Sequence, residues 1–193
     1  MGSLEIVARI ANPPEGLLAK YTRKEKEFFS DYAAFVLRQV TSPQVTEELR
    51  LLIDREQVNT GRMIDLRIMV FPARPLRGRP RNTLHGSYNQ GSSQISLYPL
   101  KLPKEWIRNG GFNLFKTPAT ELVELQEKTL SEIFTAAIST LIHEVLHVKF
   151  EGRHMSRYVE EAIVRKLERK YTEEWLDKLG RARPSSLFDN LPT

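Results

Sequence analysis

The sequence predicts an α+β fold in which a small antiparallel sheet packs on helices. Helical patterns occupy both ends of the chain, and alternating apolar residues between them indicate strands. The order of helices, then strands, then helices is typical of α+β folds, because α/β folds alternate the two throughout. With 193 residues, we expect a single domain spanning residues 1–193 and burying one core.

The composition is that of a soluble globular protein, with 40% hydrophobic and 27% charged residues. The chain has no cysteine, which excludes disulfides and thiolate ligands, so any metal must be held by nitrogen and oxygen atoms. The longest apolar run, residues 133–142, is too short to span a bilayer. The first residues lack the pattern of a signal peptide. We therefore expect a cytoplasmic protein with no membrane association.

The N-terminal third is predicted to be helical after an irregular leader at residues 1–21. Thr22 and Glu25 have the capping-box spacing, and the following residues favour a helix to about Val40. Ser42 and Pro43 are typical of the start of a second helix. These two helices form a predicted N-terminal part at residues 22–60.

Residues 61–180 form the predicted core of the domain, and residues 181–193 an extended tail. Alternating apolar residues predict a strand at 63–72, and two further strands at 84–89 and 94–99 flank a turn. A helical stretch is expected after Thr117–Pro118. Thr129 and Glu132 again have capping-box spacing, which predicts a helix from there to about Phe150, ended by Gly152. Another helix is expected at 156–171, followed by the segment TEEWLDKL.

The stretch TLIHEVLHVKFEGRH, residues 140–154, holds three of the four histidines of the chain. His143 and His147 are four residues apart and therefore project from the same side of a helix. The apolar stripe of that helix lies on the opposite side and comprises Phe134, Ile138, Leu141, Val145 and Val148. Because the histidines lie outside this stripe, we predict that they bind a metal ion, and that the ion is zinc.

Glu144 follows His143 directly, on a neighbouring side of the predicted helix. A carboxylate there can reach the surroundings of the ion without binding it. This arrangement suits a general base that takes a proton from zinc-activated water and passes it to the leaving amine of a peptide bond. The prediction is a zinc-dependent peptidase with Glu144 as its catalytic residue.

Catalytic zinc takes three protein ligands, and the sequence offers three candidates for the third. His154 follows the helix break, and we favour it because histidine is scarce in this chain. Glu160 lies on the apolar side of the next predicted helix, where an unpaired carboxylate would be costly. Glu161 lies on the polar side near Arg165, as a solvated helix charge would.

These residues resemble those of the zincin metallopeptidases. HEVLH, residues 143–147, matches their HExxH helix, and HMSRY, residues 154–158, resembles the element that supplies a histidine ligand in SprT-like and WLM-like zincins. VEEAIVRKL, residues 159–167, resembles the glutamate helix of small gluzincins, including ImmA/IrrE-like proteins and minigluzincins. The resemblance covers residues 84–170. It implies a zincin-like fold, one zinc ion per chain, a protein or peptide substrate, and an antiparallel edge strand above the cleft.

Further expectations concern the surroundings of the zinc site. Tyr158 and His85 are candidates for steadying the oxyanion. Minigluzincin-like latency would place the C-terminal tail in the cleft, with Asp189 over the metal. Four arginines in one loop suit contact with nucleic acid, so the alternative is a DNA-associated, SprT-like protease or a nucleic-acid-binding protein with structural zinc. They are Arg74, Arg77, Arg79 and Arg81.

Overall fold

The computed structural model describes residues 5–12, 16, 18–19, 21–58, 61–70, 75–76, 79–83, 85–98 and 114–181. Within them lie four α-helices and a four-stranded mixed sheet, which confirms the α+β class. The helices are α1 (Arg23–Val40), α2 (Pro43–Glu56), α4 (Glu124–Lys149) and α5 (Arg157–Arg181). The sheet strands are β1 (Glu5–Ala11), β2 (Met63–Met69), β5 (Gly86–Asn89) and β6 (Gln94–Leu97).

The sheet is mixed, and the prediction of an antiparallel sheet was wrong in this respect. The strand order is β1-β2-β6-β5, with β2 parallel to both β1 and β6, and only β5 antiparallel. The reason is the connection between β1 and β2, which runs through α1 and α2 and brings the chain back in the same direction. The predicted hairpin of β5 and β6 is present, joined by a 3₁₀ turn at Gln90–Ser92.

Strand β1 corrects the prediction of an irregular leader at residues 1–21. Glu5–Ala11 pairs with β2 over seven residues, from Glu5 opposite Met63 to Ala11 opposite Met69. Arg9 strengthens the pairing by donating two hydrogen bonds to the carboxylate of Asp65. The period-2 pattern of this edge strand is weak because it is only partly buried, so its own residues carry little signal.

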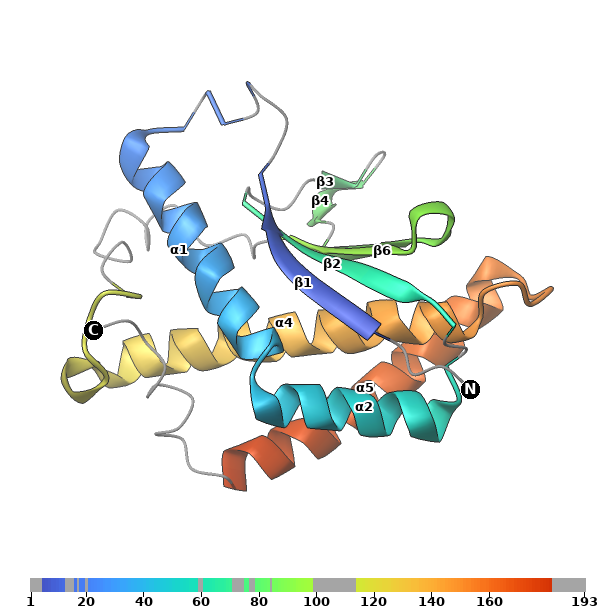
Figure 1. The fold of residues 1–193 in the computed structure, drawn as a ribbon. Coiled ribbons are helices and arrows are strands. Elements are labelled where there is room, and N and C mark those ends of the chain that lie inside the picture. The colour runs from blue at the N-terminus through green and yellow to red at the C-terminus, as the bar shows by residue number, and fades with distance from the viewer. Residues whose placement is uncertain are drawn as a thin grey trace.

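The helices form two layers on one side of the sheet (Figure 1). Helices α1 and α4 lie directly against the strands, and α2 and α5 pack beyond them. Helix α1 begins at the predicted capping box of Thr22 and Glu25, and its Phe28, Tyr32, Phe35 and Val36 are buried as expected. Helix α2 begins at the predicted Ser42 cap.

The central helix α4 is longer at its N-terminus than predicted. It begins at Glu124, with Gln126 accepting a hydrogen bond from the backbone N–H of Val123. Thr129 lies inside the helix and donates to the carbonyl of Leu125, so it does not cap the start. The predicted apolar stripe of α4 is buried, as expected. The helix is long and apolar enough to cross a membrane by length and composition alone, but more than half of that stretch is buried inside the protein.

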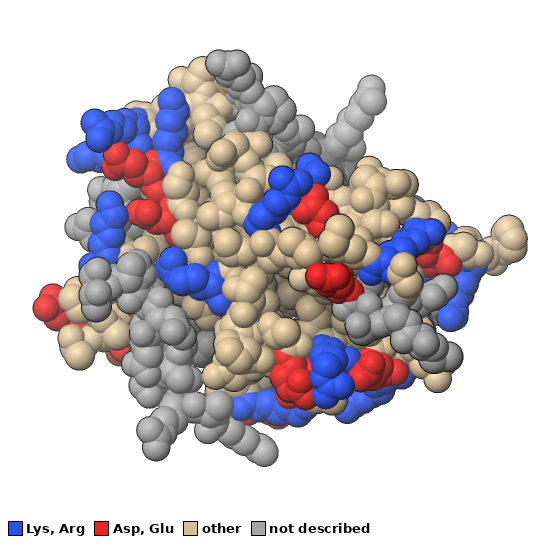
Figure 2. Space-filling model, viewed as in Figure 1, with Lys and Arg blue, Asp and Glu red and all other residues tan. Residues whose placement is uncertain are grey.

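Helix α5 is one continuous helix of 25 residues, where the sequence suggested two successive segments. The break between α4 and α5 lies at the predicted position, because Gly152 adopts a positive φ of 74°. One cluster of buried apolar side chains runs from α1 to α5. On the face shown in Figure 2, basic and acidic side chains are interspersed. Within α2, Arg50 forms ion pairs with Glu47 and Asp54.

The small hairpin of β3 (Pro75–Leu76) and β4 (Arg79–Thr83) contains part of the arginine-rich loop. Arg74 and Arg77 lie outside the described residues, and only the backbone is described at Arg79 and Arg81. The C-terminal tail after Arg181, including Asp189, also lies outside them. Contact of this loop with nucleic acid and a blocking role of the tail stay predictions.

Candidate metal centre

Helices α4 and α5 bring two histidines and one glutamate together at a single point. One ligand atom from each of His143, His147 and Glu161 can be chosen so that the three lie within 4.8 Å of one another. The two Nε2 atoms are 3.1 Å apart. Oε1 of Glu161 lies 3.7 Å from Nε2 of His143, and Oε2 of Glu161 lies 3.5 Å from Nε2 of His147. The predicted pairing of His143 and His147 is therefore present.

The donor atoms of this group fit a zinc ion. With zinc–nitrogen distances of about 2.0–2.1 Å, two donors on one tetrahedral zinc lie roughly 3.3 Å apart. The three separations here, 3.1, 3.5 and 3.7 Å, fall around that value. Two ring nitrogens that face each other so closely also need a proton or a cation between them. Two imidazoles and one carboxylate, with space left in a cleft, make up a donor set of the catalytic type.

Two further glutamates hold the imidazole rings in the orientation that metal binding needs. Nδ1 of His143 donates to Glu168 at 2.8 Å, and Nδ1 of His147 donates to Glu160 at 2.7 Å. Glu168 also accepts a hydrogen bond from the hydroxyl of Ser139. With the proton on Nδ1, each ring directs the lone pair of Nε2 toward its partner and Glu161. Glu160 is thus a supporting group of the site.

The charges around Glu161 favour the ionised form of its carboxyl group. Burial acts to raise the pKa of Glu161, but the hydrogen bond from Arg165 at 2.8 Å and the neighbouring imidazoles outweigh it, so the pKa lies below its ordinary value. Burial acts to lower the pKa of His143, yet the hydrogen bond to Glu168 and the carboxylates of Glu144 and Glu161 raise it overall. A proton therefore competes with a cation for His143, and metal affinity must fall in acid.

Glu144 is a buried carboxylate next to this group. It is only 6% exposed, and burial raises its pKa to about 7, against the opposing effect of His143. The backbone N–H of Tyr88 on the edge strand β5 donates a hydrogen bond to it. A bound cation nearby would lower this pKa again. The predicted catalytic residue is therefore held in place by the strand that faces α4.

The approach of β5 to α4 depends on Gly86. A Cβ atom at this position would lie 2.5 Å from Cγ2 of Thr140 and 2.8 Å from Oε1 of Glu144. Real Cβ atoms do not come this close to other heavy atoms, so only glycine fits there. The contact sets the distance between the edge strand and the helix that carries the histidines.

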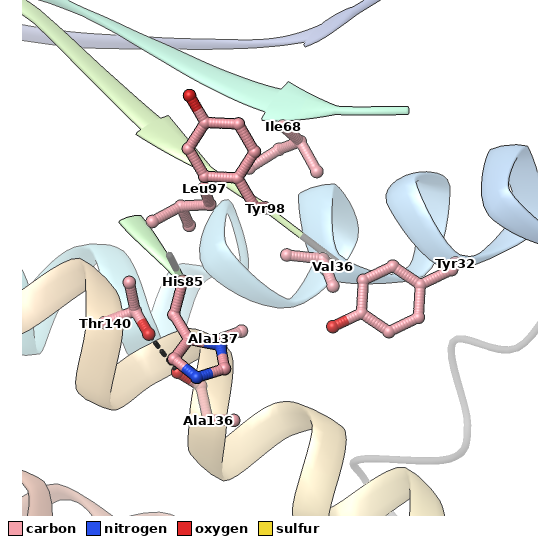
Figure 3. A pocket seen from close by; sticks show the side chains of 9 residues that line it. All are labelled: Tyr32, Val36, Ile68, His85, Leu97, Tyr98, Ala136, Ala137 and Thr140. Atoms are coloured by element: carbon pink, nitrogen blue, oxygen red, sulfur yellow. Dashed lines mark hydrogen bonds between the residues drawn. The ribbon is translucent and has the colours of Figure 1, made fainter. Parts of the chain in front are cut away.

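An open cleft surrounds the candidate centre. One wall is β5 with the preceding His85, and the other is α5 with the loop that follows α4. His85 and Thr140 also line a small cavity behind the cleft, between α1, α4 and the end of β6 (Figure 3). The imidazole of His85 lies beside Ala136 and Thr140 of α4, which precede His143 by about two turns and one turn.

The other residues predicted for the site differ in how close they lie to the histidine pair. His154, the favoured third ligand, is exposed and belongs neither to the ligand group nor to the lining of the cleft. Tyr158 lies at the rim of the cleft and is 86% exposed. Glu161, one of the three candidates for the third ligand, faces the imidazoles. The geometry thus favours Glu161 over His154 as the third ligand.

Sequence reasoning missed Glu168 and Ser139. Glu168 lies seven residues after Glu161, which is about two turns of α5, so both carboxylates face α4. The spacing was visible in the sequence. This spacing indicates two carboxylates at the histidines only once it is known that this side of α5 packs against α4.

Comparison of the chain with protein-family models, with curated proteins and with solved structures finds no match.

Proposed function

We propose that this protein is a zinc-dependent metallopeptidase with a zincin-like arrangement. The observation that carries the proposal is the convergence of His143, His147 and Glu161 beside the buried carboxylate of Glu144. Hydrolysis of a peptide bond by a metal ion requires a site for the ion, a general base and an open cleft. The His-His-Glu group, the buried carboxylate next to it and the cleft around them support this proposal.

His143, His147 and Glu161 would hold the zinc ion, with Glu168 and Glu160 fixing the two rings. Zinc bound there would act as a Lewis acid toward a carbonyl oxygen and would lower the pKa of water. Glu144 would take the proton of the attacking water on its carboxylate and give it to the nitrogen of the leaving amine. One of its oxygens is engaged by the N–H of Tyr88, which leaves the second for this transfer.

The edge strand β5 supports a peptide as the substrate. Among the strands that the structure describes, it pairs only with β6, and its residues line the cleft. A peptide in extended conformation could add to the free side through backbone hydrogen bonds. This antiparallel edge strand is also the feature that the resemblance to zincins implies.

The test is substitution of Glu144 by glutamine in zinc-loaded protein, with a library of fluorescence-quenched peptides as substrate. We expect cleavage to fall by about a hundredfold or more, as for loss of a general base, while metal analysis still finds one zinc ion per chain. Glu132→Gln is the matched control, because Glu132 is exposed on the same helix away from the cleft. Undiminished cleavage by Glu144→Gln would contradict the proposal.

A further inference from the structure

The wall of the cleft formed by α5 carries a row of charged residues at helical spacing. Arg157, Glu161, Arg165 and Arg169 succeed one another every four residues, and all line the cleft. They therefore lie along one side of α5. At about 1.5 Å per residue, Arg157 and Arg169 are separated by roughly 18 Å along the helix axis, with Glu161 between them. The row extends beyond the candidate metal centre in both directions.

Most acidic side chains of the cleft already have partners. Glu160 and Glu168 accept from the imidazoles, and Glu161 pairs with Arg165. Glu151 accepts from Tyr88 and pairs with Arg62, and Glu144 is buried. Glu173 is the cleft carboxylate for which the described residues provide no ion pair or hydrogen bond.

The arginines of the cleft are mostly unengaged. Among the described residues, Arg157 and Arg169 have no ion pair or hydrogen bond, and both are exposed. Arg153 lies over the ring of Phe150, with its guanidinium carbon 5.5 Å from the ring centre, which leaves its N–H groups available. The charge open to a ligand therefore comprises three arginines against Glu173. Arg153 and Arg157 precede Glu161 in the chain, and Arg169 follows it, four residues before Glu173.

We propose that these arginines select peptide substrates with acidic side chains on both sides of the cleaved bond. The inference rests on the proposed function, which places a peptide in this cleft. A guanidinium pairs well with a carboxylate, and Tyr158 adds an exposed aromatic surface beside Arg157. An extended peptide advances about 3.3 Å per residue, so five to six residues span the roughly 18 Å between Arg157 and Arg169.

The opposite wall favours a peptide over a nucleic acid. It is the edge strand β5, whose backbone N–H and C=O groups, apart from the N–H of Tyr88 that Glu144 engages, match those of another extended peptide chain. A phosphodiester backbone offers only acceptors and would leave the carbonyl groups of the strand without donors. The charged row on one side and the strand on the other thus suit an acidic peptide.

The experiment uses the zinc-loaded Glu144→Gln variant, which should bind substrate without cleaving it. Fluorescence anisotropy would compare labelled nonapeptides that carry two glutamates six positions apart with counterparts that carry glutamines or lysines. We expect the glutamate peptide to bind roughly fivefold more tightly than the glutamine peptide at low salt, as for two exposed ion pairs, and the lysine peptide to bind most weakly. Added salt should reduce these differences.

Arg157→Glu and Arg169→Glu, each combined with Glu144→Gln, should weaken or remove the preference for the glutamate peptide. Lys166→Glu is the matched control, since Lys166 is exposed on α5 but does not line the cleft. Equal affinity for the glutamate and glutamine peptides, or an equal effect of Lys166→Glu, would overturn the proposal. So would tighter binding of a twelve-residue oligothymidylate through the same arginines, which would assign this wall to nucleic acid.

Cleavage by the wild-type protein separates this inference from the proposed function. A charge preference in binding without any cleavage of the same peptides would contradict the peptidase proposal alone. Cleavage of all three peptides with equal binding would contradict only the selection of acidic substrates.

Discussion

Neighbouring glutamates of α5 serve different atoms of the same histidine pair. Glu160 accepts from Nδ1 of His147, while Glu161 faces Nε2 of both rings. Successive residues of a helix point about 100° apart, so the two carboxylates reach opposite sides of one imidazole. A difference of one position along α5 therefore separates a glutamate that orients a histidine ring from one that is placed to bind a metal.

The assignment of the third ligand can be tested by zinc affinity. Glu161→Ala removes a donor atom, and we expect a loss of more than roughly a hundredfold, because even loss of an orienting partner costs 10-fold to 100-fold. Glu160→Ala should fall within that smaller range. Competition with a chelator of known affinity measures both. His154→Ala is the control, and a loss in this variant as large as in Glu161→Ala would restore His154 as the ligand.

Gly86 is the second residue whose identity matters for the site. Gly86→Ala places a methyl group against Thr140 and Glu144, and we expect it to destabilise the protein by about 1–3 kcal/mol, as overpacking does. Urea unfolding measures the change. Gly91→Ala in the same hairpin is the matched control, because the atom nearest to its added Cβ is 3.6 Å away. Equal stability of the two variants would show that β5 and α4 can separate without cost.

At the level of elements, a half-buried ionic group joins the three helices behind the site. Glu56 of α2 accepts a hydrogen bond from Nζ of Lys149 on α4 at 2.5 Å and another from the hydroxyl of Tyr171 on α5. Lys149 is the last residue of the helix that carries the histidines. The group therefore ties the C-terminal end of α4 to both neighbouring helices.

Glu56→Gln should lower the free energy of unfolding at pH 7 by about 1–3 kcal/mol, since Lys149 then loses its charged partner. Burial acts to raise the pKa of Glu56, but hydrogen bonds from Lys149 and Tyr171 outweigh it and lower the pKa overall. A lowered pKa stabilises the fold above the unfolded value of 4.5, and this contribution disappears as the pH falls below it. Urea unfolding of both proteins at several pH values should show the difference shrinking below pH 4.5. A constant difference would assign the loss to packing.

At the level of the whole molecule, the candidate metal site links α4 to α5. Two donors come from the helix that packs on the sheet, and one comes from the helix of the outer layer. A cation bound at this point would join the two helix layers at the open cleft. If the proposed metal binds there, its binding is coupled to the stability of the fold.

Removal of zinc should lower the thermal stability of the protein. At a free zinc concentration of a hundred times Kd, binding to the folded state alone stabilises it by about 2.7 kcal/mol. Thermal unfolding with a chelator, and again after addition of zinc, measures this difference. The Glu161→Ala variant should respond much less to the same treatment. Identical unfolding curves with and without zinc would contradict a metal site at this position.

Local signals of the sequence were sufficient for most helices and for the histidine pair. The caps at Thr22 and Ser42, the alternation in β2 and the break at Gly152 act over a few neighbouring residues, so the chain displays them directly. His143 and His147 share a helix face for the same reason. Strand β1 and the start of α4 were not predicted correctly, because an edge strand and a helix end depend on distant partners.

Three features of the site follow only from the tertiary structure. They are the position of Glu161 as a candidate third ligand, the hydrogen bond from His143 to Glu168, and the close approach of β5 to α4 at Gly86. Each depends on how closely α5 or β5 packs on α4, and this distance is set by contacts between residues far apart in the chain. The scarcity of histidine in the chain favoured His154 as the third ligand. The number of histidines does not indicate which side of α5 faces the cleft. Helical periodicity is a property of adjacent residues, whereas a metal site is formed where separate elements meet.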